Sequence, residues 1–97
     1  MRYDIVLAPE AVDDLKHLDA RDRSTVRDAI ERHLRSDPKK ASKSWIKRLR
    51  GVSRPEYRLR VGELRIFYDV RETRVEVLAI VPKALTSQWL ERYGRAK

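Results

Sequence analysis

Residues 57–68 carry the strongest structural signal of the chain and read Tyr57-Arg-Leu-Arg-Val-Gly-Glu-Leu-Arg-Ile-Phe-Tyr68. Apolar and polar residues alternate on both sides of Gly62-Glu63, and a two-residue loop that begins with glycine is typical of a β-hairpin. The pairing that this loop sets places Arg60 opposite Arg65. The segment therefore predicts two antiparallel strands, 57–61 and 64–70.

Three arginines share one face of the predicted hairpin. Side chains alternate between the two faces of a strand, so Arg58, Arg60 and Arg65 lie together with Phe67 and Asp69, while apolar residues fill the other face. Like charges directly opposite each other destabilise a strand pair by up to about 1 kcal/mol. A bound phosphate would remove this cost, because guanidinium groups donate paired hydrogen bonds to phosphate oxygens. The alternative is that Asp69 or another acid neutralises the arginines.

The N-terminal part of the chain predicts a strand and two helices. Residues 3–7 form a short apolar run that is typical of a strand, and Pro9 stands where a helix can begin. Asp19 can cap a second helix that continues to about Ser36, where Asp37-Pro38 ends it. Because the connection between the helices is so short, they must form an antiparallel hairpin.

The remaining segments complete an α+β fold. The pattern predicts a basic loop at residues 39–44, a strand at 45–49 and a break at 51–55. After the hairpin it predicts a further strand at 74–81. Leu85, Trp89 and Tyr93 are four residues apart, which predicts a short final helix that ends at Gly94. We expect a single domain, residues 1–97, in which an N-terminal strand and an antiparallel helical hairpin pack on a mainly antiparallel β-sheet, with a short C-terminal helix. Phe67 is expected either to stack on an unpaired base or, more in keeping with this fold, to be buried under the final helix.

Composition excludes several classes of protein. The chain has 97 residues, of which 41% are hydrophobic and 39% charged, and it contains no cysteine. The lack of cysteine rules out disulfides, thiol nucleophiles and Cys-ligated metal centres. The apolar runs are too short for a membrane span, and the start of the chain lacks the apolar region of a signal peptide, which predicts a cytoplasmic protein.

The net charge of +8 is concentrated in one quarter of the sequence. Between Pro38 and Gly62 there are nine cations, and Glu56 is the only acid, so this stretch carries the whole excess and the remainder is neutral. A local positive field of this kind attracts polyanions such as nucleic acid. The alternative interpretation is a solubilising surface.

The order strand, helical hairpin, basic loop and basic β-hairpin resembles the RelE/ParE superfamily of toxins from toxin–antitoxin pairs. The residues that carry the resemblance are Leu49-Arg50-Gly51, the hairpin 57–68, and the later strand residues Val77-Leu78-Ala79-Ile80-Val81. The resemblance covers nearly the whole chain and implies a RelE-like fold.

The resemblance also implies a function. RelE-like members cut messenger RNA in the ribosomal A site and are held inactive by a cognate antitoxin in a hetero-oligomeric complex. The 2′-hydroxyl of the RNA attacks the adjacent phosphate, and neither a metal nor another cofactor is needed. The protein is therefore expected to orient this attack, stabilise charge on the phosphate and move protons.

The family's site residues can be placed on this chain by position. Arg58 and Arg60 match the two basic residues of one family strand, and Arg65 matches the arginine of the next strand that contacts the scissile phosphate. Lys83 lies beside a further basic position, and Tyr93 is a candidate for proton transfer. Six other cations are expected to dock on ribosomal RNA: Lys39, Lys40, Lys43, Lys47, Arg48 and Arg50.

Two departures from the family pattern keep other functions open. Ala84 stands where RelE-like nucleases often have arginine, and Leu90 stands where many have a catalytic tyrosine. ParE-like members of the superfamily poison DNA gyrase and lack the nuclease residues. The sequence therefore favours an endoribonuclease, with a gyrase inhibitor, or a weakly active partner of an antitoxin, as the alternatives.

Overall fold

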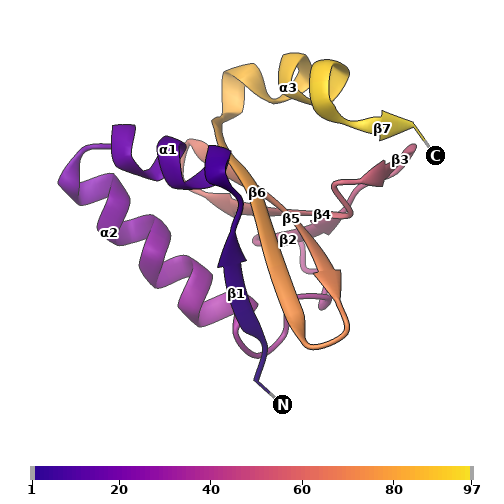
Figure 1. The fold of residues 1–97 in the computed structure, drawn as a ribbon, viewed down its shortest axis with the longest axis horizontal. Coiled ribbons are helices and arrows are strands. Elements are labelled where there is room, and N and C mark those ends of the chain that lie inside the picture. The colour runs from indigo at the N-terminus through magenta and orange to yellow at the C-terminus, as the bar shows by residue number, and fades with distance from the viewer. Residues whose placement is uncertain (1, 97) are drawn as a thin grey trace.

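The computed structural model describes residues 2–96, and its central element is a five-stranded sheet with the strand order β1-β6-β5-β4-β2 (Figure 1). The strands are β1 (Asp4–Leu7), β2 (Ile46–Arg48), β4 (Tyr57–Val61), β5 (Leu64–Arg71) and β6 (Arg74–Pro82). β1 runs parallel to β6, and the other neighbouring strands of this sheet are antiparallel. The predicted α+β class and the mainly antiparallel sheet are confirmed.

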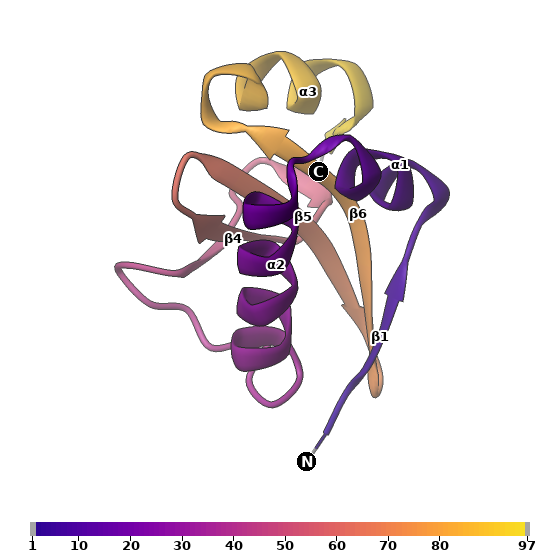
Figure 2. The ribbon, with the colours of Figure 1, turned by 90° about the vertical axis from the view of Figure 1, so that its left-hand side faces the viewer.

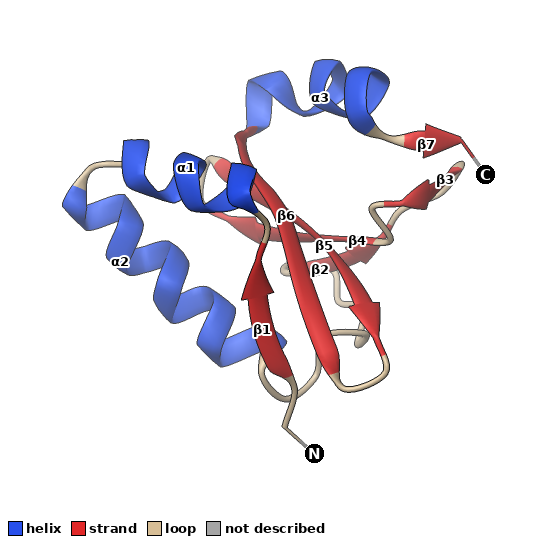
Figure 3. Ribbon diagram, in the orientation of Figure 1, coloured by secondary structure: helices blue, strands red, loops and turns tan. Residues whose placement is uncertain are grey.

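The helical hairpin lies against one face of this sheet (Figures 2 and 3). It consists of α1 (Pro9–His17), α2 (Ala20–Ala29) and a π-helical turn, η1 (Ile30–Leu34), that continues α2. The predicted cap is present, because the Asp19 carboxylate accepts the backbone N–H of Asp22 at 2.8 Å. The second helix ends two residues earlier than the sequence predicts.

The core lies between the helical hairpin and the sheet. The helices contribute buried residues at helical spacing, and the sheet contributes the apolar face of the β4–β5 hairpin: Ala11, Leu15, Val26, Ile30, Leu34, Leu59, Ile66 and Tyr68. The Tyr68 hydroxyl donates a hydrogen bond to the Pro38 carbonyl at 2.6 Å, and burial raises the pKa of this phenol. Tyr68 therefore ties the loop after η1 to the middle of the sheet.

The C-terminal helix packs on the opposite face, and at this helix the structure corrects one expectation. A 3-10 turn, η2 (Lys83–Leu85), leads into α3 (Thr86–Tyr93). The predicted apolar stripe is wrong in part, since Leu85 is 46% and Tyr93 52% exposed. Trp89 and Leu90 make the contact instead, and the Trp89 ring stacks on Phe67 with the ring centroids 4.8 Å apart. The expected burial of Phe67 under this helix is confirmed.

A second correction concerns residues 51–55, where the sequence predicts only a break. This segment contains β3 (Val52–Arg54), which pairs with β7 (Arg95–Ala96) at the end of the described chain (Figure 1). The small two-stranded sheet holds the end of α3 over the main sheet. Within residues 2–96, no helix combines the length and the apolar character needed to cross a bilayer.

The predicted end of α3 at Gly94 depends on close packing of the backbone. Gly94 donates its N–H to the Leu90 carbonyl at 2.8 Å, and a Cβ atom at this position would lie 2.5 Å from the same oxygen. We expect Gly94→Ala to lower the free energy of unfolding by about 1–3 kcal/mol, as overpacking does in other proteins. Urea unfolding measures this loss, with Ala96→Gly on the exposed end of the chain as the control. Equal stability of Gly94→Ala and the wild type would contradict the prediction.

A stacked pair of rings holds the loop after η1. The His33 and Trp45 rings lie 4.9 Å apart at an interplanar angle of 26°. Burial, and secondly the charge of Arg32, lower the pKa of His33. Because the unfolded chain binds the proton more readily than the folded chain, stability is complete above the ordinary pKa of about 6.5 and decreases as the pH falls below it.

Urea unfolding of the wild type and of His33→Phe tests this pH dependence. The phenylalanine ring retains a stacking surface but carries no titrating proton. We expect the wild type to lose more stability than His33→Phe between about pH 8 and pH 5. Parallel losses in the two proteins would show that His33 does not contribute to the pH dependence.

Candidate functional site

The β4–β5 hairpin has the pairing that the sequence predicts. Arg60 lies opposite Arg65, and Arg58 lies opposite Phe67. Gly62 in the loop has a φ of +57°, a left-handed conformation that glycine adopts without strain. Arg58, Arg60 and Arg65, termed the arginine cluster, therefore lie on the face of the sheet opposite the helical hairpin.

The guanidinium groups of the arginine cluster are near enough to repel one another. The pKa of Arg58 is lowered, first by burial and then by the charges of Arg65 and Arg60. Its Nε atom is buried and has no hydrogen-bond partner among the described residues. An unsatisfied buried donor costs about 1–3 kcal/mol, so this arginine is held in place at a cost in stability.

No carboxylate forms an ion pair with the arginine cluster within residues 2–96. The arginines that do form ion pairs are Arg35, Arg48, Arg54 and Arg71. Asp69 shares the face of the cluster, as the sequence predicts, but it pairs with other arginines. Neutralisation of the cluster by Asp69, the alternative raised by the sequence, is therefore wrong.

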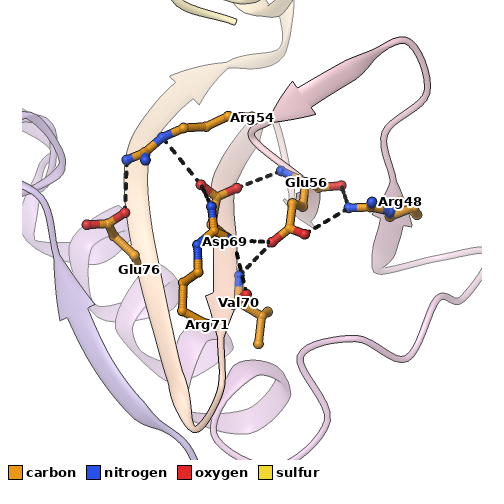
Figure 4. Close-up of polar contacts among 7 residues, drawn as sticks. All are labelled: Arg48, Arg54, Glu56, Asp69, Val70, Arg71 and Glu76. Atoms are coloured by element: carbon orange, nitrogen blue, oxygen red, sulfur yellow. Dashed lines mark hydrogen bonds and ion pairs between the residues drawn. The ribbon is translucent and has the colours of Figure 1, made fainter. Parts of the chain in front are cut away.

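The acids instead gather in a network at the other end of the same strands (Figure 4). Asp69 is fully buried, and its carboxylate accepts the Glu56 N–H at 2.8 Å and lies 3.3 Å from Arg54 Nε and 3.7 Å from Arg71. Arg54 also reaches Glu76 at 2.9 Å, and Arg71 reaches the Glu56 carboxylate at 3.0 Å. These contacts join β3, β5 and β6 to Glu56, the residue just before β4.

Burial dominates the electrostatics of this network. It raises the pKa of Asp69, while the Glu56 N–H and the charges of Arg54 and Arg71 act in the opposite direction. Arg54 belongs to the stretch that carries the whole excess of positive charge, but in the structure it pairs with Asp69 and Glu76, which neutralise it. No pattern in the sequence signals this pairing, since the partners come from separate strands.

Arg65 has a structural role as well as a place in the cluster. Only 5% of its surface is exposed, and its Nη1 donates to the Gly62 and Leu64 carbonyls, both at 2.9 Å. These bonds close the hairpin loop from one side. Substitution of Arg65 would therefore disturb the loop, whereas Arg60 is exposed and can be changed without this effect.

The structure separates two neighbouring cations of β2 that the sequence treats alike. Lys47 lies opposite Arg58 in the β2–β4 pair, so it shares the face of the arginine cluster and adds a fourth cation. Arg48 lies on the other face, with its guanidinium carbon 5.1 Å from the centre of the Tyr57 ring and its Nη1 3.4 Å from the Glu56 carboxylate. Arg48 therefore does not join the cluster.

The other predicted RNA-binding cations lie in exposed loops. They are Lys39, Lys40 and Lys43 between η1 and β2, and Arg50 between β2 and β3. None of the four forms an ion pair with an acid in residues 2–96. They extend the positive surface but are not part of the arginine cluster.

The two remaining candidates differ in position. Lys83 is exposed, and its backbone N–H donates to the Glu63 carbonyl at 2.8 Å, next to the loop of the β4–β5 hairpin. Lys83 therefore lies at the end of the sheet that carries Arg60 and Arg65. Tyr93 instead borders two grooves lined by α1, β3, β6 and α3, and no residue of the arginine cluster lines either groove. The Tyr93 ring lies 5.4 Å from the Trp89 ring, which stacks on Phe67.

The fold and the arginine cluster together define a class of protein, the small basic toxins of the RelE/ParE superfamily. The chain belongs to the family described as the ParE toxin of the type II toxin–antitoxin system parDE, whose model matches residues 5–84. It is therefore a toxin of a type II toxin–antitoxin system, and the superfamily resemblance seen in the sequence is confirmed. A comparison with curated proteins gave no match.

Solved structures agree with this fold. A chain of the RelB–RelE antitoxin–toxin complex from Methanococcus jannaschii aligns with a TM-score of 0.67 and 24% identity over 87% of this chain and 96% of its own. A chain of the archaeal RelE–RelB complex from Pyrococcus horikoshii OT3 aligns with a TM-score of 0.64 and 24% identity, over 86% of this chain and 97% of its own. The YoeB dimer from Staphylococcus aureus aligns with a TM-score of 0.58 and 20% identity, over 84% of this chain and 97% of its own. At these identities the likeness establishes a RelE-like fold.

Proposed function

We propose that this toxin is an endoribonuclease that cleaves messenger RNA on the ribosome and so inhibits translation. The observation that supports this most strongly is the arginine cluster, in which three guanidinium groups crowd together without a carboxylate while the nearby acids pair with other arginines. Such a cluster suits a phosphate group. Residues 1–97 would form one cytoplasmic toxin domain.

The proposed reaction is transfer within the RNA chain. The 2′-oxygen forms a bond to the adjacent phosphorus, the bond from phosphorus to the 5′-oxygen of the next nucleotide breaks, and the proton of the 2′-hydroxyl replaces that bond on the leaving oxygen. Negative charge develops on the phosphate oxygens, and Arg58, Arg60 and Arg65 would stabilise it. Lys83 and Lys47 would add positive charge beside them.

Proton transfer is the weaker part of this site. Arginine remains protonated near neutral pH and is a poor general base. Tyr93 lines two grooves that no arginine of the cluster lines, and Leu90 packs on the buried apolar group that includes Phe67. General acid–base catalysis contributes about 10²–10⁴-fold, so this enzyme is expected to rely on positioning and on electrostatic stabilisation, at a lower rate.

The same observations favour one second candidate, a non-nuclease toxin that binds DNA gyrase. The family model that matches is that of a ParE toxin. Leu90 stands where many RelE-like nucleases have a catalytic tyrosine. In that case the cluster would bind a DNA or protein anion without cleaving it.

A cognate antitoxin is part of the proposal. The matched family and two of the similar structures come from toxin–antitoxin systems. The excess of positive charge suits an acidic partner segment, because complementary charge increases the rate of association. We expect the antitoxin to be a small acidic protein that forms a hetero-oligomer with the toxin.

Primer extension on a reporter message in translating ribosomes tests the proposed function. The wild type is expected to cut in the A site, and Arg60→Gln is expected to cut less, since Arg60 is exposed and its loss spares the hairpin loop. Arg21→Gln, an exposed cation of α2 on the opposite face, is the matched control and should cut normally. Absence of cuts from the wild type, together with DNA breakage and intact early translation, would replace this proposal by gyrase inhibition.

A further inference from the structure

Lys47 is a lysine that lies next to the arginine cluster, and two observations place its side chain on the face of the cluster. It lies opposite Arg58 in the β2–β4 pair, and residues directly opposite each other project to the same face of a sheet. Leu49, two residues further along the chain, packs on the buried group of the same face that includes Phe67. Ile46, by contrast, is buried in the core under the helical hairpin. Register and alternation therefore agree on the side of Lys47.

The surroundings of Arg58 differ on its two sides. On the β5 side its neighbour is Phe67, which is 1% exposed and is covered by the Trp89 ring with the ring centroids 4.8 Å apart. On the β2 side its neighbour is Lys47, which is exposed and forms no ion pair with an acid in residues 2–96. A phosphate bound at Arg58 is therefore enclosed by aromatic rings on one side and open to Lys47 on the other.

The Lys47 ammonium can reach such a phosphate. Opposite residues of an antiparallel pair have Cα atoms about 4.5–5.5 Å apart. The four-carbon stem of lysine is flexible and carries its three N–H donors over a neighbouring side chain. The ester oxygens of a phosphate on Arg58 thus lie within reach of Lys47 Nζ.

Lysine can supply a proton that the arginines of the cluster cannot. A guanidinium keeps its proton throughout the biological pH range, whereas an ammonium gives up its proton more readily. In the proposed reaction the 5′-oxygen would leave as a strongly basic alkoxide unless it receives a proton. A positioned proton donor accelerates a step of this kind by about 10²–10⁴-fold.

We propose that Lys47 is a catalytic residue of this site, the general acid that protonates the leaving 5′-oxygen. This inference rests on the proposed function. As the bond from phosphorus to the 5′-oxygen breaks, its electron pair takes a proton from Lys47 Nζ and forms the 5′-hydroxyl. The proton of the 2′-hydroxyl passes to water, and water returns a proton to Lys47, so the net transfer is that of the reaction given above.

Single-turnover cleavage on ribosomes that carry a synthetic message provides the test. One message has the normal bridging 5′-oxygen at the cut codon, and the other has sulfur in its place. A thiolate is a much weaker base than an alkoxide, so it leaves without receiving a proton. On the oxygen message Lys47→Arg, which keeps the charge, should cut about 10²–10⁴-fold more slowly than the wild type. On the sulfur message the two proteins should cut at the same rate.

Controls separate the loss of a proton donor from the loss of charge and of fold. Arg60→Gln removes charge that would stabilise the phosphate, so it should be slowed on both messages. Lys16→Arg makes the same change as Lys47→Arg at an exposed position of α1, on the opposite face, and should cut both messages as the wild type does. Full activity of Lys47→Arg on the sulfur message would itself show that this variant is folded.

Three results would overturn the inference, and they have different meanings. Normal cutting of the oxygen message by Lys47→Arg would remove the general acid and leave the proposed function intact. Equal slowing of Lys47→Arg on both messages would assign Lys47 to binding of the RNA, and not to proton transfer. Failure of the wild type to cut either message would overturn the general acid and the proposed nuclease function together.

Discussion

Replacing Arg58 by glutamine is expected to lower the rate of message cleavage on the ribosome by about 10²–10³-fold, as the loss of one preorganised donor to a developing charge does in other enzymes. The guanidinium of Arg58 is half-buried, and its Nε has no partner among the described residues. Because it is partly removed from water, its attraction for a phosphate is screened less than that of an exposed cation. Rates from primer extension measure the loss.

Arg58→Gln should not lower the free energy of unfolding. This result would distinguish a residue of the functional site from a residue that supports the fold. Arg58 is repelled by the like charges of Arg65 and Arg60. Its removal should therefore leave the free energy of unfolding unchanged or raise it by up to about 1 kcal/mol. Arg58→Lys keeps the charge but not the planar fork, and it should be intermediate in rate. A loss of stability that parallels the loss of activity would refute this interpretation.

Arg74→Gln is the matched control for Arg58→Gln. It makes the same change of charge at an exposed position at the far end of β6, where the side chain forms no ion pair with a described acid. Its cleavage rate should equal that of the wild type. Equal losses in the two variants would mean that only the total charge matters, and the arginine cluster would lose its special role.

Asp69→Ala should lower the free energy of unfolding by about 3–5 kcal/mol, more than Gly94→Ala does. The carboxylate is fully buried, and its removal leaves the Glu56 N–H without an acceptor and Arg54 with half of its partners. The total stability of a domain of this size is about 5–15 kcal/mol, so the variant is expected to lose a large share of it. Urea unfolding monitored by circular dichroism gives the difference.

Two milder substitutions show whether the network acts through its buried hydrogen bond or through its surface charges. Asp69→Asn keeps an oxygen that can accept the Glu56 N–H and should lose less than Asp69→Ala. Glu76→Gln removes the one-third-exposed partner of Arg54 and should lose about 1 kcal/mol or less. If Glu76→Gln were as damaging as Asp69→Ala, the exposed ion pair, not the buried carboxylate, would hold β3 to the sheet.

The sequence was informative about the hairpin because the forces there are local. A two-residue loop with glycine at a left-handed φ leaves one pairing, and alternation then assigns every side chain to a face. The opposition of Arg60 and Arg65 was therefore predictable from a dozen residues. The cap at Asp19 was predictable for the same reason, since the bond spans only three residues.

The sequence was less informative about the C-terminal segment. Helical spacing identified α3 but not the side that packs, because Leu85 and Tyr93 fit the stripe as well as Trp89 does. The apolar patch that receives the helix is small and is formed by Phe67, Ala79 and Val81 from two strands. It accommodates Trp89 and Leu90 and leaves the ends of the stripe exposed.

The local sequence pattern thus determined the strands, the helical hairpin and the placement of three arginines on one face of the sheet. The tertiary structure alone set which charges remain without partners: it brings Arg54, Glu56, Asp69 and Glu76 together from β3 to β6 and leaves the arginine cluster outside their network. It likewise places Trp45 against His33 and Trp89 against Phe67. The physical reason is range. Helix caps, tight turns and the alternation of side chains depend on residues close together in the chain, whereas the pairing of charges depends on which distant strands the core draws together.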